Sequence, residues 1–467
     1  MSISKVLLIS CYELGHQPFS LASPLKFMSD EGILVDSVDL AVEDINNYYD
    51  QIQSSLLIFV SVRMHNALRQ GVRLSQKIRT INDRVHLCFY GDYAGLNAEY
   101  LLSDSHADSI ISGEFEISMV ELARLILNEA YDYKSPPEGV STSCVKSEPV
   151  LQRMPFLVPE RQGLPDYSNY ARFRDEHGKL HLAGSTETTR GCKYECLHCP
   201  VTSVYHGRFF VIPEDVVLSD IRNQVEKGVR HISFMDPDFL NGPSHSMKIV
   251  RSLNNEFPEI TFDFTARISH LLKYKDYLIE IKNSGCAFVV SALELLNDGI
   301  LDLLDKGHTR LDIERTTKMF QEIDLVWRPS LLPFTPWTSI DDFLDLVDFV
   351  GSNDLINNID PVQFSLRLLI PPNSVLYDSY SHSSWMGNLD AANFTYIWHH
   401  SDLRMERLWS EINDLVRESQ KLDSSYYNTF IKIEKLAYEL AGKDMSFSKF
   451  VTQHRPIPAG LTESWFC

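Results

Sequence analysis

The sequence predicts an α/β protein built as a doubly wound domain, then a partial (β/α)6 TIM-like barrel, then a helical C-terminal extension. Short, continuously apolar runs alternate with helical patterns over residues 1–130, and the alternation returns from about residue 179 with longer helices. Such runs indicate strands buried on both faces, as in parallel sheets. At 467 residues, the chain is long enough for about two or three domains.

The first domain, over residues 1–130, is expected to contain a Rossmann-like parallel sheet covered by helices on both faces. Its strands are predicted at 5–10, 33–40, 55–62, 85–90 and 107–113. Ligands of such sheets bind beyond the carboxyl ends of the strands. The segments that fall there, rich in glycine and polar residues, are 11–18, 63–67, 91–97 and 113–116.

Residues 131–170 contain six prolines and are expected to form an irregular linker. The barrel is predicted over residues 171–375, with a helix at 213–227 after its first strand. Its strands are expected within 181–190, 231–236, 260–268, 286–294, 325–334 and 361–370. These are fewer units than a complete TIM barrel has, so an open barrel is predicted. Residues 376–467 are expected to be helical, chiefly at 404–422 and 428–443.

Three cysteines, Cys192, Cys196 and Cys199, follow the first barrel strand in the stretch TRGCKYECLHCP. They supply one thiolate fewer than the set that usually closes an iron–sulfur cluster. An unsaturated iron binds a substrate directly, much as catalytic zinc keeps an open position. The alternative is a structural zinc site, which usually takes two separated ligand pairs. The chain has no second C-x2-C, and His198, between two of the cysteines, would strain a tetrahedron.

At this motif the chain resembles the radical S-adenosylmethionine (SAM) superfamily. The resemblance implies that the three cysteines hold a [4Fe–4S] cluster, whose fourth iron is chelated by the amino and carboxylate groups of SAM. One-electron reduction then cleaves SAM to a 5′-deoxyadenosyl radical. The six predicted strand–helix units and the position of the cysteine loop agree with the barrel of that superfamily.

The resemblance also implies roles for polar residues at the strand ends. His198 would lie beside the adenine, and Asp236 or Asp238 would bind the SAM ammonium. Arg267 would face the SAM carboxylate and Glu294 a ribose hydroxyl. The alternatives are a helix N-cap for the aspartates and a surface ion pair for Arg267 and for Glu294.

The first domain resembles the cobalamin (B12)-binding domain that is fused to one branch of this superfamily. The resemblance lies in its position before the barrel, its five predicted strands and the closing Gly113-Glu114. It implies cofactor contacts at Gly15, His16, Arg63, Gly91, Gly113 and Glu114. The D-x-H-x-x-G signature is absent, so His16, Arg63 and His65 are the candidates for the lower face. The alternative is a degenerate domain that docks a substrate or a partner.

Several stretches are similar to the CUAEP/CCAEP-tail radical SAM (seleno)proteins, namely YELGHQPFSLASP, FLNGP, LDKGHT, LPFTPWT and GLTESWFC. Those proteins continue past Trp-Phe-Cys with a second cysteine or selenocysteine and then Ala-Glu-Pro, whereas this sequence ends at Cys467. One hypothesis is a selenocysteine codon read as a stop. The alternative is a tail with a single terminal thiol.

Composition narrows the classes of partner and compartment. The net charge of −20 disfavours nucleic acid, and no apolar run approaches the ~18 residues of a membrane span. The amino terminus lacks the pattern of a signal peptide, and the other cysteines are scattered. A cytoplasmic protein is expected, since a reducing compartment also suits an exposed cluster.

The sequence therefore predicts a cobalamin-dependent radical SAM enzyme that transfers a carbon group, methyl by default, to a small molecule. Its expected electron donor is a flavodoxin or a ferredoxin. Three alternatives are a tRNA methylthiotransferase, a non-catalytic iron–sulfur sensor or scaffold, and an alkyltransferase acting on a metalloid such as arsenic. The first alternative would need three more cluster cysteines in the first domain. There Cys11 lies at a strand end, but Cys88 lies inside a strand and Cys144 in the linker.

Overall fold

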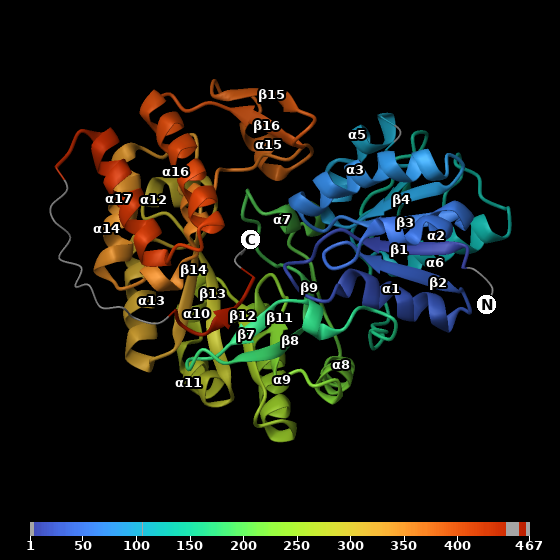
Figure 1. The fold of residues 1–467 in the computed structure, drawn as a ribbon, viewed down its shortest axis with the longest axis horizontal. Helices are drawn as coiled ribbons and strands as arrows, with labels where there is room; N and C mark the ends of the chain where they lie inside the picture. The colour runs from blue at the N-terminus through green and yellow to red at the C-terminus, as the bar shows by residue number, and fades with distance from the viewer. Residues whose placement is uncertain (1–3, 105, 445–456, 464–467) are drawn as a thin grey trace.

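The computed structural model of the chain describes residues 4–104, 106–444 and 457–463. Two parallel sheets lie side by side, and helices of the C-terminal region pack against the second one (Figure 1). The α/β class, the doubly wound first sheet and the curled second sheet are confirmed. The residue limits of the four predicted parts stay predictions.

The first sheet has the strand order β2-β1-β3-β4-β5-β6. Its parallel strands are β1 (Val6–Ser10), β2 (Val35–Asp39), β3 (Leu57–Ser61), β4 (His86–Tyr90) and β5 (Ser109–Ile111). All five lie where the sequence predicted them. The segment expected to be an irregular linker adds a short antiparallel edge strand, β6 (Val140–Ser141).

Helices cover both faces of the first sheet because side chains alternate along each strand. Leu7 and Ile58 pack with α3 (His65–Ile81). Leu8 packs on the opposite face with α1 (Phe19–Asp30) and α6 (Glu116–Leu127). Three shorter helices lie in the connections between strands. They are α2 (Tyr49–Ser54) before β3, and α4 (Asp92–Leu96) and α5 (Ala98–Ser103) between β4 and β5. Burial on both faces explains why the strands read as continuous apolar runs.

The second sheet has the order β14-β13-β12-β11-β8-β7-β17. Its parallel strands are β8 (Leu180–Thr186), β11 (His231–Phe234), β12 (Thr261–Thr265), β13 (Cys286–Glu294) and β14 (Val326–Leu331). Two antiparallel strands, β7 (Arg172–Arg174) and β17 (Gly460–Leu461), extend it beyond β8. β17, at the end of the described chain, therefore pairs with β7, which is the first strand of this sheet in the sequence.

The sixth barrel strand, expected within 361–370, is wrong as a regular strand. Residues Pro361–Ser365 form a short 3-10 helix instead, and a single parallel bridge joins Phe334 to Arg367. Proline lacks a backbone N–H and has a φ preset for the first helical position, and Asp360 caps this turn by accepting from the Val362 N–H. These two local preferences outweigh the apolar pattern that favoured a strand.

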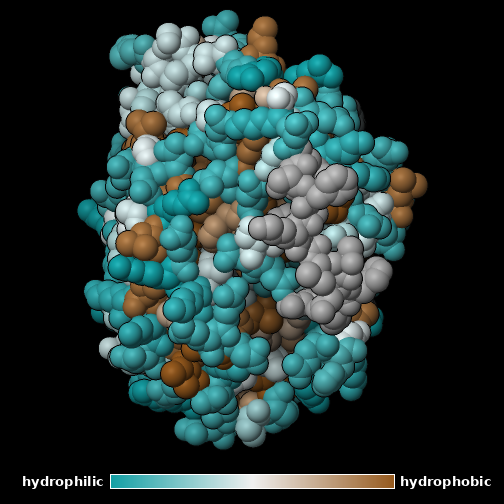
Figure 2. All heavy atoms as spheres, turned by 90° about the vertical axis from the view of Figure 1, so that its left-hand side faces the viewer, coloured by the Kyte–Doolittle hydropathy of each residue, from teal (hydrophilic) through white to brown (hydrophobic). Residues whose placement is uncertain are grey.

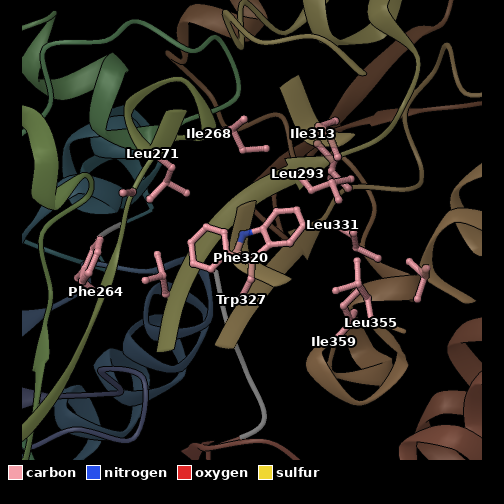
Figure 3. Close-up of a cluster of buried hydrophobic side chains, with 14 of the residues drawn as sticks. Phe264, Ile268, Leu271, Leu293, Ile313, Phe320, Trp327, Leu331, Leu355 and Ile359 are labelled. Carbon is pink, nitrogen blue, oxygen red and sulfur yellow. The ribbon is translucent and has the colours of Figure 1, made fainter. Parts of the chain in front are cut away.

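The outer face of the second sheet carries the largest hydrophobic core. Phe264, Leu293 and Trp327 point from three neighbouring strands toward the covering helices (Figure 3). Trp327 stacks on Phe320 at 5.9 Å and donates its indole N–H to Ser291 Oγ at 2.6 Å. The covering helices are α8 (Glu214–Glu226), α9 (Pro243–Glu256), α11 (Lys275–Asn283), α12 (Asp298–Leu303), α13 (Arg310–Ile323) and α14 (Ile340–Ser352).

The C-terminal region contains the predicted helices as α16 (Leu403–Lys421) and α17 (Tyr426–Ala441), preceded by α15 (Val375–Tyr380). The region also contains an element that the sequence did not reveal, because β15 (Met386–Asp390) and β16 (Thr395–Trp398) form an antiparallel hairpin. Its turn reaches the first sheet's domain, where Phe394 is buried beside Tyr100. The Asn393 carbonyl lies 2.6 Å from His65 Nε2.

Arg367, which lies inside the stretch predicted as the sixth barrel strand, contacts the C-terminal region. Its guanidinium lies 3.8 Å from the Trp398 ring centre, donates to the Trp398 carbonyl and pairs with Glu406 of α16. The charge has the partner that burial requires. That partner lies in the C-terminal region, so the residue fastens this region to the second sheet.

One face of the molecule, over the C-terminal helices, is mostly hydrophilic with separate hydrophobic residues (Figure 2). Leu403 and Leu422, at the two ends of α16, are among the exposed apolar residues of the chain. Scattered exposed apolar residues are normal on soluble surfaces. In the described part of the chain, no helix combines the length and the apolar character that crossing a bilayer requires.

The hairpin turn gives a stability prediction. Phe394→Ala should lower the free energy of unfolding by about 3 kcal/mol, because it removes a buried ring from the core of the first sheet's domain. Urea denaturation followed by tryptophan fluorescence would measure the change. Leu389→Ala, in the exposed part of the same hairpin, is the control and should change little. Equal effects of the two substitutions would contradict the placement of the turn.

Candidate metal-cluster site

The cysteine loop begins where β8 turns into the short strand β9 (Thr189–Gly191), which pairs with β10 (Phe209–Val211). Gly191 has a φ of +76°, and a Cβ there would lie 2.5 Å from the Arg208 carbonyl oxygen. Only glycine fits this turn without strain. Cys192 follows directly, so the backbone of Gly191 sets the direction in which the loop leaves the sheet.

The three cysteines lie on one loop, and the last of them starts a helix. Cys199 precedes α7 (Pro200–Tyr205), and its N–H donates to the Cys196 carbonyl at 3.1 Å. Burial, with the neighbouring Cys196 adding, raises the pKa of Cys199 to about 11. Burial also raises the pKa of Cys192. Both are therefore neutral thiols in the protein alone, and metal binding would have to displace their protons.

The donor set fits an iron–sulfur cluster. In the described ranges, no group of three or more His, Cys, Asp or Glu side chains is gathered closely enough to hold one metal ion. Structural zinc needs its four ligands at about 2.0–2.3 Å from a single ion. A cluster instead takes each thiolate on its own iron, so three cysteines spread along a loop suit it. Cys11 and Cys88 lie buried in the first sheet's domain and Cys144 is exposed in the linker, away from this loop.

Two cations lie beside Cys196. Arg267, which follows β12 and precedes α10 (Ile268–Lys273), has its Nη1 2.5 Å from Cys196 Sγ. Its guanidinium stacks 3.9 Å from the centre of the Tyr194 ring. Lys306 is buried, and its pKa is raised because Glu294 and Cys196 together outweigh the cost of burial. The loop thus has positive charge at the place where a bound cluster would carry negative charge.

The structure brings the predicted residues His198 and Glu294 together. His198 Nε2 lies 3.1 Å and Lys306 Nζ 2.9 Å from Glu294 Oε1. Burial alone would raise the pKa of Glu294, but Lys306 and His198 outweigh it and hold that pKa far below its usual range. Glu294 ends β13 with a φ of +63°, which turns its side chain toward the cysteine loop. Sequence reasoning missed Lys306, although its stretch LDKGHT was noted.

Asp236 and Asp238 both lie near the loop, but protein groups already bind them. Asp236 accepts hydrogen bonds from the Thr188 N–H and from the Thr188 and Thr189 hydroxyls, and burial raises its pKa to about 6. Asp238 caps the 3-10 turn Phe239–Asn241. The predicted capping alternative is therefore what Asp238 does here. A role in binding SAM stays a prediction for both.

His270 lies between Asp238 and Tyr194, an arrangement that the sequence did not reveal, and its contact with Asp238 lacks hydrogen-bond geometry. His270 Nδ1 lies 2.7 Å from Asp238 Oδ2, and its Nε2 lies 2.7 Å from the Tyr194 hydroxyl. Tyr194 belongs to the cysteine loop, whereas His270 belongs to α10. The side chain of His270 thus connects the end of β11 to the loop. The other candidates were chosen because they lie at strand ends. Tyr194 and His270 do not, so this signal did not mark them.

Arg190, two residues before Cys192, joins the loop to the first sheet's domain. Its guanidinium pairs with Glu187 at 2.8 Å, Glu114 at 3.0 Å and Glu116 at 2.7 Å. Arg190 is 5% exposed, and all three carboxylates are at least as buried. The rings of Phe19, Phe115 and Phe156 surround the guanidinium. Because Glu114 and Glu116 follow β5, this buried ion cluster connects the carboxyl ends of the two sheets.

The residues predicted to contact a corrinoid take part in the same junction. Arg63 pairs with Glu187 at 2.7 Å and with Glu13 at 3.2 Å. Glu114 accepts from the Tyr205 hydroxyl as well as from Arg190. Gly113 has a positive φ, and a Cβ there would lie 2.3 Å from the Val150 carbonyl oxygen, so it makes room for the linker. Gly91 opens α4 with a φ of +104° and packs closely on Arg63.

Gly15 and His16 face the second sheet. The Gly15 carbonyl accepts from the Ala171 N–H at 2.9 Å, and Glu463 leaves no room for a Cβ at Gly15. His16 is buried, and burial lowers its pKa to about 4 although Asp263 of β12 opposes the shift. His65, the other histidine predicted as an axial candidate, is tied to Asn393. The buried Nδ1 of His16 has no hydrogen-bond partner among the described residues.

The topology suits a cofactor between the sheets, although Arg63, Glu114 and His65 are bound to other protein groups. The order β2-β1-β3 puts the switch point of the first sheet between β1 and β3. Ligands of such sheets bind at that point. The segments there are 11–18 and 63–67, and Arg63 pairs with Glu187 just before the strand that leads to Cys192. A group bound there would lie next to the cysteine loop.

The middle of the chain matches the model of a known family. Residues 186–350 match the model of the Radical SAM superfamily. Two curated relatives come from Chlorobaculum tepidum. Bacteriochlorophyllide d C-12(1)-methyltransferase is 28% identical over 44% of this chain, and bacteriochlorophyllide d C-8(2)-methyltransferase is 22% identical over 60% of it. The chain spans 41% and 59% of the length of these two proteins.

Solved structures share the fold over more of the chain. The cobalamin-dependent S-adenosylmethionine radical enzyme OxsB with aqua-cobalamin bound has a TM-score of 0.69 at 15% identity, over 93% of this chain and 72% of that one. The radical S-adenosylmethionine methyltransferase TsrM of Kitasatospora setae, with cobalamin and a [4Fe–4S] cluster, has a TM-score of 0.59 at 18% identity. That match covers 75% of this chain and 70% of the other.

The buried ion cluster gives a second stability prediction. Arg190→Met should cost about 3–5 kcal/mol, because it leaves three carboxylates buried without their cation. Urea denaturation of the protein without cofactors would measure it. Arg222→Met removes an exposed pair with Glu256 and should cost at most about 1 kcal/mol. If the Arg190 variant loses no more than this control, the cluster does not hold the two sheets together.

The same cluster predicts a pH dependence. Burial, with Glu116 adding and Arg190 opposing, raises the pKa of Glu114 to about 7. Between about pH 5 and 7 the folded chain keeps a proton that an unfolded glutamate has lost, so this group makes stability fall as pH rises. Glu114→Gln should flatten that decline in urea denaturation at several pH values. Glu176→Gln, at an exposed turn, should not. Equal slopes for the wild type and Glu114→Gln would refute the assignment.

Proposed function

We propose that this chain, whose residues 186–350 form a radical SAM domain, is an enzyme that cleaves SAM reductively and transfers a methyl group to a small-molecule acceptor. The observation that carries the proposal is the loop with Cys192, Cys196 and Cys199, which follows the first parallel strand of a curled sheet. The two curated relatives are methyltransferases, which supports methyl as the transferred group. The acceptor is proposed only as a small molecule.

The cysteines would hold a [4Fe–4S] cluster, which when bound supplies the electron and the open iron that SAM cleavage needs. Arg267 and Lys306, beside Cys196, would balance the negative charge at the loop. His198 and Glu294, already in contact, would receive the adenine and a ribose hydroxyl, with Lys306 keeping Glu294 ionised as an acceptor. Asp236 and Asp238 are proposed for the SAM ammonium.

We further propose that cobalamin binds at the carboxyl edge of the first sheet. OxsB and TsrM, which share this fold, were both solved with cobalamin bound. Segments 11–18 and 63–67, with Gly91, would hold it chiefly through backbone groups, because Arg63 and Glu114 pair with Glu187 and Arg190. Gly15 and Gly113 would act by allowing close packing. A group held there would be shielded from water by both sheets.

The partners and location follow from the same proposal. A cluster at Cys192–Cys199 needs one-electron reduction, so a flavodoxin or a ferredoxin is the proposed donor. The net charge of −20 makes nucleic acid a poor partner. A cytoplasmic location is proposed, because an oxygen-sensitive cluster suits a reducing compartment. The terminal Cys467, and the hypothesis of a selenocysteine beyond it, lie outside the described residues.

Anaerobic reconstitution tests the function. After treatment with iron and sulfide, the protein should show iron–sulfur absorbance and, with a strong reductant, convert SAM to 5′-deoxyadenosine. Replacing Cys192, Cys196 and Cys199 by alanine should abolish both, whereas Cys144→Ala, at an exposed linker cysteine, should abolish neither. A cluster without any SAM cleavage would favour the sensor, and zinc uptake in place of a cluster would refute the proposal. Corrinoid absorbance after incubation with hydroxocobalamin tests the second cofactor separately.

A further inference from the structure

Asn241 is a buried amide beside the first cysteine of the loop. It ends the 3-10 turn after β11 and is 3% exposed. Its Oδ1 lies 3.8 Å from Cys192 Sγ, where it accepts the thiol proton. Its Nδ2 has no hydrogen-bond partner among the described residues. A buried amide donor without a partner is costly and calls for an explanation.

The position of Asn241 relative to the loop is fixed through its backbone. The Lys193 ammonium donates to the Asn241 carbonyl at 3.1 Å, so the residue that follows Cys192 is hydrogen-bonded to the turn. The Asn241 N–H donates to the Asp238 carbonyl at 3.0 Å within the same turn. The side-chain amide is therefore kept at the sulfur of Cys192 whichever of its two ends faces that sulfur.

Binding of iron reverses which end of the amide suits the sulfur. A thiolate has no proton to donate, so Oδ1 and an iron-bound Sγ would be two acceptors facing each other. A half-turn of the amide puts Nδ2 at the sulfur and forms a charge-assisted N–H···S bond. It also gives the unpartnered donor a partner, and leaves in its place an acceptor, which is tolerated better.

We propose that Asn241 donates an N–H···S hydrogen bond to Cys192 in the cluster-loaded protein and thereby raises the reduction potential of the cluster. Reduction adds negative charge that is shared by the ligand sulfurs, and a donor at a sulfur stabilises that charge. Asn241 is a positioning and tuning residue, since it acts through Cys192. The inference depends on the proposed function only in assuming a cluster at the three cysteines.

The test is a potentiometric titration of the reconstituted cluster, followed by electron paramagnetic resonance without SAM. Asn241→Leu, close in shape but without a donor, should shift the midpoint to a more negative value than the wild type has. Asn241→Asp should shift it further, because a carboxylate adds negative charge. Asn97→Leu, which removes an equally buried amide from the first sheet's domain, should leave the midpoint unchanged.

A measurement on the wild type covers the case in which the variants fail to take up iron. Asparagine labelled with ¹⁵N in its side chain should give a nitrogen hyperfine coupling to the reduced cluster that is absent without the label. No coupling, or an unchanged midpoint in Asn241→Leu, overturns the inference. Failure of the wild type itself to form a cluster overturns the proposed function as well, so the two failures are distinguishable.

Discussion

A buried ion cluster relates the two sheets to each other. The Arg190 guanidinium lies among carboxylates from both sides of the junction, and Arg63 adds a pair with Glu187. Taking these charges out of water is expensive, so they are stable there only while they remain paired. Arg190 belongs to the strand that leads to Cys192, and Glu114 and Glu116 follow the last parallel strand of the first sheet. Electrostatic pairing therefore fixes the position of the cysteine loop relative to the first sheet. The proline-rich linker alone does not fix this position.

Charged and polar side chains also surround the cysteines. Cations approach Cys196, whereas Asp238 and the amide of Asn241 lie on the side of Cys192. On the Cys192 side, the Lys193 ammonium donates to the Asn241 carbonyl at 3.1 Å. Cations therefore lie near both ends of the cysteine loop.

Much of the fold was predictable, because buried parallel strands leave a plain apolar pattern in the sequence. The ten parallel strands fall where that pattern put them. The failures have local causes. Pro361 and the Asp360 cap favour a helical turn over an apolar pattern, and the hairpin strands β15 and β16 are half-exposed, so they lack that pattern. The cysteine motif was equally plain, since its chemistry resides in adjacent residues.

The other site residues were harder to predict because polar strand ends serve two purposes. Arg63 and Glu114 were selected as cofactor contacts, yet here they pair with Glu187 and Arg190, next to the second sheet. A sequence shows that such a residue needs a partner but not which surface supplies it. His270 is 76 residues from Tyr194, and Lys306 follows Glu294 by 12 residues with a helix between them, so only the fold places these pairs together.

The hairpin turn at Phe394 has a consequence for the order of assembly. It begins in the region that Arg367 fastens to the barrel, and it ends in the core of the first sheet's domain. A third tether thus spans the junction in addition to the linker and the ion cluster. This contact forms only once the core of the first sheet's domain is in place, because Phe394 is buried among its side chains.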